Sequence, residues 1–200
     1  VALDAASGRT RWSVDTGGMM FAAPTIAGDR LYVPTRGGDV LALEAATGAQ
    51  RWRSENTGGL LATSPVVDAG ELYLFTIRGI YAFDAETGVE LWMQPIDEAW
   101  ATRPPVLTPE FVIVAAGGRV DVFNRRNGER TYYYRFAAVQ PRSLSVQGDT
   151  LLAVYSRRLA GIGVHSKRPW WEPLRPFWIR MWIWKMAPDV PPPPEVWSAG

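Results

Sequence analysis

One turn occurs four times in this sequence, each time 40 residues after the previous copy. Its clearest copy spans residues 84–92 and reads DAETGVELW, and related text stands at residues 4–12, 44–52 and 124–132. The glycines of the four turns are Gly8, Gly48, Gly88 and Gly128. A fixed period of this length indicates a repeat architecture, so the fold has to be interpreted one repeat at a time.

The residue types in the turn predict a hairpin. A short apolar stretch, residues 80–83 in the clearest copy, precedes Asp84, whose side-chain oxygen can accept hydrogen bonds from nearby backbone amides. Gly88 can adopt a left-handed backbone, which a residue with a Cβ adopts poorly. The strand that leaves the turn carries a large aromatic residue, which can bury its ring between neighbouring repeats. We predict that these aromatic residues anchor one repeat to the next: Trp12, Trp52, Trp92 and Tyr132.

Each period holds four short strands separated by glycine and proline. In the first full period we expect strands near residues 24–28, 30–35, 39–44 and 49–54, and the later periods repeat them 40 residues on. Four antiparallel strands in about 40 residues match one blade of a β-propeller. The sequence therefore predicts an all-β propeller with about four blades. Three are complete, at residues 24–53, 65–93 and 105–135; a half blade precedes them and a partial blade follows at 144–164.

The repeated text Ala-x-Asp-x-x-Thr-Gly-x-x-x-Trp resembles the repeat of the quinoprotein (PQQ-like) β-propellers. Residues 82–92 match every position of it, residues 42–52 have Glu44 in the acidic position, and residues 2–12 have Ser7 in place of threonine. The copy at 124–132 keeps the glycine alone. The resemblance covers residues 1–164, which we expect to form one propeller domain.

What the resemblance implies about function is broad. The family includes quinone-dependent dehydrogenases, the propeller lipoprotein of outer-membrane protein assembly, and sensor or scaffold domains without a cofactor. A complete ring in the family has about seven or eight blades. We therefore expect an incomplete ring here, from a longer protein or a degenerate propeller completed by a partner, although a closed four-bladed ring remains an alternative.

The composition argues against several catalytic sites. There is no cysteine, and His165 is the single histidine, which excludes thiol chemistry and a multi-histidine metal site. The resemblance implies that a quinone enzyme would need a calcium site of Glu, Asn and Asp, a catalytic aspartate and commonly a pair of adjacent cysteines, and no residue carries over to these roles. Asp4, Glu44 and Asp84 are interpreted as turn residues. We thus predict no enzyme and no catalytic, cofactor-binding or metal-binding residue.

Residues 165–200 differ from the repeats and form a second predicted region. They contain six of the ten tryptophans, with arginine and lysine among them and a run of prolines at 191–194. Tryptophan flanked by positive charges is typical of membrane interfaces and of protein–protein hot spots. We predict a tail that docks on a partner or a membrane surface, with a short helix at 177–186. The predicted docking residues are Trp170, Trp171, Phe177, Trp178, Arg180, Trp182, Trp184, Lys185 and Trp197.

These observations favour a non-catalytic scaffold or assembly subunit whose partners are other proteins of a membrane-associated complex. Contact with a membrane interface is a further possibility, whereas the net charge of +1 does not indicate nucleic acid. The resemblance implies a bacterial periplasmic or cell-envelope location. Two alternatives stay open: a fragment of a quinone-dependent dehydrogenase, and a ligand-sensing propeller. The basic pair at 125–126 is interpreted as solvated loop charge, with contact to an acidic partner or lipid phosphate as the alternative.

Overall fold

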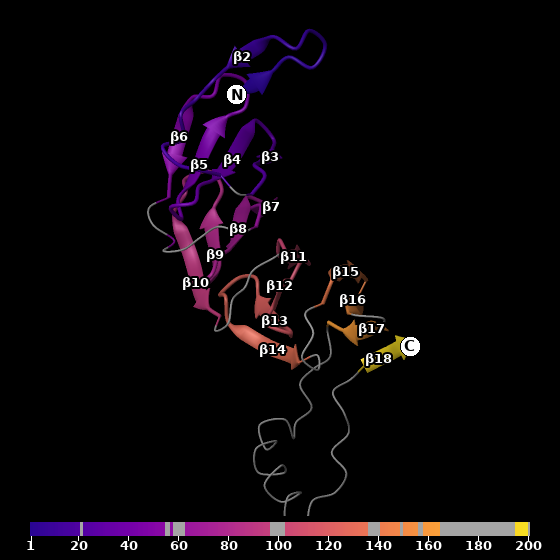
Figure 1. Cartoon of the computed structure of the whole chain (residues 1–200). Helices are drawn as coiled ribbons and strands as arrows, with labels where there is room; N and C mark the ends of the chain where they lie inside the picture. Colours follow the sequence, from indigo (N-terminus) through magenta and orange to yellow (C-terminus); the bar gives the residue numbers. More distant parts are fainter. Residues whose placement is uncertain are drawn as a thin grey trace, which may run out of the picture. The chain divides into compact units, whose positions relative to one another are not determined.

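The structure is a computed structural model, and it describes residues 1–20, 22–54, 57, 63–96, 103–135, 141–148, 150–155, 158–164 and 195–199. All the regular secondary structure in these residues is β-strand. The strands form four-stranded antiparallel sheets and one two-stranded sheet (Figure 1). The prediction of an all-β chain built from four-stranded blades is confirmed.

The sheets follow one another along the chain. A half blade contains β1 (Ala2–Leu3) and β2 (Thr10–Trp12). Blade 1 contains β3 (Thr25–Ala27), β4 (Arg30–Pro34), β5 (Val40–Glu44) and β6 (Gln50–Arg53). Blade 2 contains β7 (Val66–Asp68), β8 (Glu71–Phe75), β9 (Gly79–Asp84) and β10 (Glu90–Pro95). Blade 3 contains β11 (Val106–Leu107), β12 (Phe111–Ala116), β13 (Arg119–Asn124) and β14 (Arg130–Arg135). Blade 4 contains β15 (Ser143–Gln147), β16 (Thr150–Tyr155), β17 (Arg158–Gly163) and β18 (Glu195–Ala199).

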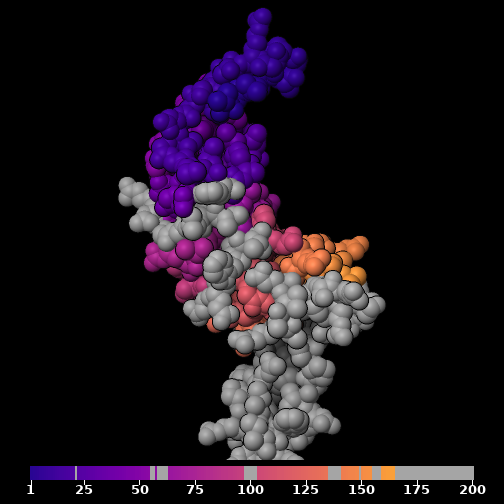
Figure 2. Space-filling model, viewed as in Figure 1, coloured from indigo at the N-terminus to yellow at the C-terminus, as the bar shows by residue number. Residues whose placement is uncertain are grey.

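The chain divides into two compact units, Val1–Ala138 and Val139–Gly200. The first unit holds the half blade and blades 1 to 3, which succeed one another in chain order (Figure 2). The second unit holds blade 4. In every blade the strands pair in their order along the chain, so each connection within a blade joins neighbouring strands. The strands of blade 1 lie within one residue of the bounds expected from the sequence.

The middle strands of the blades in the first unit are buried on both faces. In β9, Ile80, Tyr81, Ala82 and Phe83 are all at most 5% exposed, although their side chains alternate between the two sides of the sheet. A strand with one solvated face would show alternating burial instead. The outer strand β6 is largely exposed. Blades 1 and 2 are therefore layers covered on both sides through their middle strands, with exposed residues on their outer strands.

The layers that cover blades 1 and 2 are their neighbours within the first unit. One core cluster joins Tyr32, Val40 and Ala42 of blade 1 to residues of β8 and β9 in blade 2. A second joins Phe75 and Ile80 of blade 2 to residues of β12 and β13 in blade 3. A single blade could not bury both of its apolar faces, which is why the repeats stack.

Blade 4 corrects one expectation about the C-terminal region. We predicted a partial blade that ends at residue 164 and a tail over residues 165–200. In the structure Glu195–Ala199 forms β18 and pairs antiparallel with β17, with Gly161 opposite Trp197 and Ile162 opposite Glu195. The 40-residue period could not reveal this strand, because residues 164–194 separate it from β17. The Trp-rich sequence, residues 165–194, therefore lies along the chain between two paired strands of one blade.

None of the described residues belongs to a helix long and apolar enough to cross a bilayer. The helix that we expected at residues 177–186 falls outside the described residues.

Candidate functional site

The repeated turn is a hydrogen-bonded hairpin with its acidic residue at the centre. In the clearest copy the amide and the hydroxyl of Thr87 donate to Asp84 Oδ1, at 2.7 and 2.8 Å. The Gly88 amide donates to the Asp84 carbonyl at 2.8 Å, and Gly88 has a φ of +75°. Hydrogen bonds from Thr87, the hydroxyl first, hold the pKa of Asp84 below its usual value.

The other copies use the same arrangement with different residues. Asp4 accepts hydrogen bonds from Ser7 and from Arg11, whose Nη2 lies 2.7 Å from Asp4 Oδ2. The hydrogen bond from Arg11, followed by those from Ser7, lowers the pKa of Asp4 to about 2. In blade 1 the Thr47 hydroxyl donates to Glu44 Oε2 at 2.7 Å. Each of these carboxylates is thus engaged within its own hairpin.

The tryptophan of each turn docks on the turn of the next repeat. The indole Nε1 atoms of Trp12, Trp52 and Trp92 donate to the carbonyls of Ala45, Ala85 and Arg125, at 3.0, 3.1 and 3.0 Å. The six-membered part of each ring covers the glycine of that next turn. A Cβ placed on Gly48, Gly88 or Gly128 would lie 2.6 Å from a ring atom of the tryptophan. Glycine is therefore needed at these positions for two reasons: its backbone adopts the positive φ, and a side chain would occupy the space of the tryptophan ring.

The first and last members of the series differ from the middle ones. Gly8 has the same backbone, with a φ of +68°, but a Cβ there would meet no described atom within 4 Å. Tyr132 takes the place of tryptophan in blade 3 and is 7% exposed, with its ring 6.3 Å from that of Phe111 and 5.4 Å from that of Tyr134. Burial raises the pKa of its hydroxyl.

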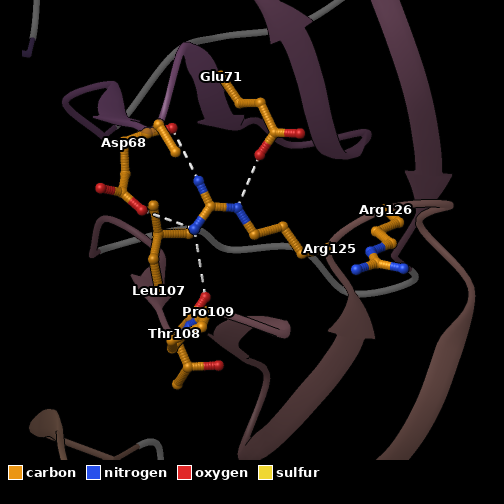
Figure 3. Close-up of a pocket in the computed structure, with 8 residues that line it drawn as sticks. Asp68, Glu71, Leu107, Thr108, Pro109, Arg125 and Arg126 are labelled. Carbon is orange, nitrogen blue, oxygen red and sulfur yellow. Dashed lines mark hydrogen bonds and ion pairs between the residues drawn. The ribbon is translucent and has the colours of Figure 1, made fainter.

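A second contact between blades 2 and 3 is centred on Arg125, which is 7% exposed (Figure 3). Its Nε donates to Glu71 Oε2 at 2.7 Å, and its Nη1 donates to Asp68 Oδ2 at 2.6 Å. Nη2 donates to the Asp68 carbonyl at 2.7 Å, and Nη1 also approaches the Thr108 carbonyl at 3.3 Å. The guanidinium lies 5.6 Å from the centre of the Tyr73 ring. Arg125 therefore joins two strands of blade 2 to blade 3.

The interpretation of the basic pair as solvated loop charge is wrong for Arg125 and holds for the exposed Arg126. One feature of the sequence could have indicated that Arg125 has a special role. The position that is Ala45 in blade 1 and Ala85 in blade 2 is arginine in blade 3, so the turn of blade 3 carries an extra charge. Its acidic partner Glu71 lies in the preceding repeat, which the sequence alone did not indicate.

Blades 1 and 2 are also joined by an ion pair, but here the arginine belongs to the earlier blade and the carboxylate to the later one. Arg30, at the start of β4, pairs with the Glu86 carboxylate in the turn of blade 2. Its Nη1 also donates to the Ala85 and Glu86 carbonyls, at 3.2 and 3.0 Å. Glu71 occupies the corresponding first position of β8. The cation is thus on the earlier blade at one interface and on the later blade at the next.

An open hollow of about 580 Å³ lies beside Arg125. It is lined by Asp68, Ala69, Glu71, Leu107, Thr108, Pro109, Arg125 and Arg126 (Figure 3). Its most buried charge, Arg125, already donates to carboxylates and carbonyls on both sides of the blade interface. Because all three nitrogens of this guanidinium already donate to protein oxygens, it offers little to an incoming ligand, and the hollow has the chemistry of a structural clamp.

The predicted docking residues of the C-terminal region fall outside the described residues, with one partial exception. Trp197 lies in β18, where its backbone pairs with β17. The structure thus places the backbone of Trp197 inside a blade, and the docking role of all these residues stays a prediction.

The sequence matches the family model described as outer membrane protein assembly factor BamB, in two overlapping stretches at residues 1–79 and 36–173. The chain belongs to this family. The family match confirms the resemblance to PQQ-like repeat propellers that the turn text indicated. No curated protein sequence matches the chain.

Solved propeller structures are similar to the chain in fold. BamB from Moraxella catarrhalis superposes with a TM-score of 0.67 at 22% identity, over 79% of this chain and 51% of that one. The quinohemoprotein alcohol dehydrogenase ADHIIG from Pseudomonas putida HK5 gives 0.64 at 13% identity, over 76% and 34%. The computationally designed Ika4 protein gives 0.64 at 13% identity, over 73% and 91%. The chain therefore spans about half the length of the Moraxella BamB.

The described residues contain no group of three or more His, Cys, Asp or Glu side chains placed to hold a metal ion. The three anchor tryptophans likewise offer no platform for the quinone cofactor of the dehydrogenase branch. A flat quinone would need an open aromatic face. The ring faces of Trp12, Trp52 and Trp92 are instead covered by the glycines of the following turns.

Proposed function

We propose that this chain is a non-catalytic scaffold or assembly subunit that binds other proteins of a membrane-associated complex. The observation that carries this proposal is the family match to outer membrane protein assembly factor BamB across residues 1–173. The proposed location is the periplasmic side of a bacterial outer membrane, as the description of the family suggests.

The geometry of the repeats supports the same proposal. The repeated residues, from the acidic turn residue to the tryptophan, are used to stack one blade on the next. Apart from the tryptophan, the outer strands β6 and β10 differ in sequence, and each carries exposed residues. A rigid stack with variable exposed edges is suited to holding partners in fixed positions. We propose that the Trp-rich residues 165–194 add a further docking element, because this sequence interrupts a blade between two paired strands.

Affinity purification of the tagged chain from cross-linked cell envelopes tests the proposal. We expect the chain to be recovered with a fixed set of envelope proteins at constant ratios, because a scaffold forms stoichiometric contacts. A matched control is a designed propeller of similar size with the same tag, which shares the fold without the exposed edges of this chain. Recovery of the chain alone, or with the same proteins as the control, would contradict the proposal.

A quinone-dependent dehydrogenase fragment is the second candidate, and the similarity to the quinohemoprotein alcohol dehydrogenase favours it. The two candidates differ in one assay. Addition of pyrroloquinoline quinone and calcium to the purified chain produces a bound-quinone absorption band and dye-linked alcohol oxidation only if the chain is an enzyme of that branch. Turnover at about 1 s⁻¹ or faster, which is ordinary for enzymes, would replace the scaffold proposal.

A further inference from the structure

The outer strand of blade 3 differs from those of the other blades in the first unit. Within the described residues, β14 ends the order of its sheet, so one of its edges has no pairing strand there. Free edges are sites where another chain can add a strand, and proteins protect them with short length, proline or charge. In β6 the protection is length and charge, since it has four residues and two arginines. In β10 it is Pro95, which has no N–H to donate.

β14 lacks these protections over its middle residues. It has six residues and reads RTYYYR, so its charges stand at the two ends and the residues between them are uncharged. Long edge strands rich in threonine and tyrosine have high β-propensity and accept added strands readily. Among the outer strands of blades 1 to 3, β14 therefore has the fewest of these protections within its own sequence.

A cluster of four side chains gives this strand a chemical preference. Tyr133, 47% exposed, lies opposite Asp121 of β13. The guanidiniums of Arg119 and Arg130 lie 5.5 and 5.8 Å from the centre of the Tyr133 ring. Asp121 is fully buried and pairs with both, through Arg119 Nε at 2.7 Å and Arg130 Nη1 at 3.6 Å. We name these residues the Tyr133 cluster.

Burying the Asp121 carboxylate costs free energy, because the carboxylate loses its hydration. Paired positive charges must offset this cost. At the corresponding positions blade 1 pairs Leu41 with Arg53, and blade 2 pairs Tyr81 with Met93. The stack therefore does not require a carboxylate there. What Asp121 does is hold two guanidiniums beside an exposed tyrosine, and the cluster keeps a net positive charge. Arginine and tyrosine are the side chains most often found at binding hot spots.

We propose that the edge of β14 and the Tyr133 cluster together bind an extended, acidic segment of a partner protein, which adds to blade 3 as a fifth strand. The backbone of the segment pairs with the free edge, its apolar side chains contact Tyr133, and its carboxylates accept hydrogen bonds from Arg130, whose side chain is 46% exposed. The proposal rests on the proposed scaffold function and names the surface that serves it.

Fluorescence anisotropy with a labelled peptide tests this binding. The probe is a peptide of about eight alternating valine and glutamate residues, a typical strand length, and its control replaces each glutamate with glutamine. We expect the acidic peptide to bind the full chain about tenfold more tightly than the glutamine peptide, because charge-assisted hydrogen bonds are roughly twice as strong as neutral ones. We expect binding to weaken as salt is raised.

Two variants and one control locate the site. Arg130→Gln and Tyr133→Ala should each weaken binding by about tenfold or more. Arg126→Gln removes an exposed arginine from the turn of the same blade and should leave binding unchanged. Equal melting temperatures of the variants show that the fold is retained. Equal peptide affinity in the wild type, Arg130→Gln and Tyr133→Ala would overturn the proposal.

Two other occupants have distinct outcomes. If the chain binds vesicles of phosphatidylglycerol through these residues and not the acidic peptide, the surface is a membrane contact and the proposal fails. The second occupant would be the acidic pair that follows β10 in the sequence, Asp97 and Glu98. If Asp97→Asn with Glu98→Gln raises the affinity for the peptide tenfold, these residues compete with the peptide for the Tyr133 cluster and the proposal also fails. If Arg130→Gln with Tyr133→Ala still recovers the same envelope proteins as the wild type, the site is wrong while the scaffold function stands.

Discussion

Gly88→Ala should destabilise the protein far more than a glycine substitution with the same backbone strain elsewhere in the blade. Gly88 and Gly70 have φ values of +75° and +81°, so the left-handed backbone costs an alanine roughly 1 kcal/mol at either position. At Gly70 a Cβ meets no described atom within 4 Å, whereas at Gly88 it would lie 2.6 Å from two ring atoms of Trp52. Gly70→Ala is therefore a matched control for the backbone effect.

The extra cost at Gly88 follows from what the ring must do. Trp52 has to move, which weakens the hydrogen bond from its Nε1 to the Ala85 carbonyl, now 3.1 Å long and worth about 1 kcal/mol. Displacing a ring that packs against blade 2 adds about 1–3 kcal/mol, as for other overpacked sites. We expect Gly88→Ala to lower the free energy of unfolding by about 3–5 kcal/mol and Gly70→Ala by about 1 kcal/mol.

Urea unfolding followed by tryptophan fluorescence measures both variants. A second measurement separates the ring contact from strain. In a Trp52→Ala background the space is open, so Gly88→Ala should cost only the backbone term, and the two substitutions should be non-additive by about 2 kcal/mol or more. Equal effects of Gly88→Ala and Gly70→Ala, or additivity with Trp52→Ala, would refute the role assigned to the glycine.

Two further predictions concern charges. Arg125→Met should lower the free energy of unfolding by about 2–4 kcal/mol, because Glu71 and Asp68 lose their buried partner, whereas Arg126→Met should change it by less than about 0.5 kcal/mol in chemical denaturation. Equal effects would contradict the clamp. The carboxyl of Asp4 should titrate with a pKa of about 2 in an NMR titration of the folded chain, and Arg11→Gln should raise that pKa. Because Asp4 and Asp84 have depressed pKa values in the folded state, their contribution to stability is complete above about pH 4 and is lost as the pH falls below it. A midpoint for Asp4 near 3.9 would contradict the hydrogen bonds of the turn.

The blades could be predicted from the sequence because each repeat contains the residues that determine its own strands and turn. The apolar strands, the acidic turn residue, the glycine and the tryptophan recur with the same spacing, and each one acts on its own repeat or on the next. The periodicity of Trp12, Trp52 and Trp92 indicated packing between repeats. It did not indicate that each ring would lie on the glycine of the following turn, because that requires knowing how two blades are offset.

The burial of Arg125 and the pairing of β18 could not be predicted from the repeat pattern. Arg125 stands at an exposed-looking turn position, and it is buried because Asp68 and Glu71 come from the neighbouring blade. β18 pairs with β17 although residues 164–194 lie between them, so no regular spacing could connect the two strands. The same holds for the Tyr133 cluster, whose members are separated in sequence and are brought together by strand pairing. Long-range pairing decided each of these cases.

The pairing of β17 with β18 permits a direct test of the proposed docking function. Deleting residues 165–200 would remove a strand of blade 4 together with the Trp-rich sequence. Since Ile162 pairs with Glu195 as Phe83 pairs with Glu90, residues 163–194 can be replaced by residues 84–89, which form the turn between the corresponding strands of blade 2. This graft keeps the pairing of the blade and removes the docking sequence alone.

The measurement is quantitative co-purification of envelope proteins with the tagged full chain and with the graft. We predict that the full chain recovers its partners at a constant ratio. The graft, with an unchanged melting temperature, should lose about tenfold or more of that recovery, because several tryptophans worth roughly 2–3 kcal/mol each are removed. Undiminished recovery with the graft would show that the Trp-rich sequence does not dock. Recovery of no partner by either chain would contradict the scaffold function itself.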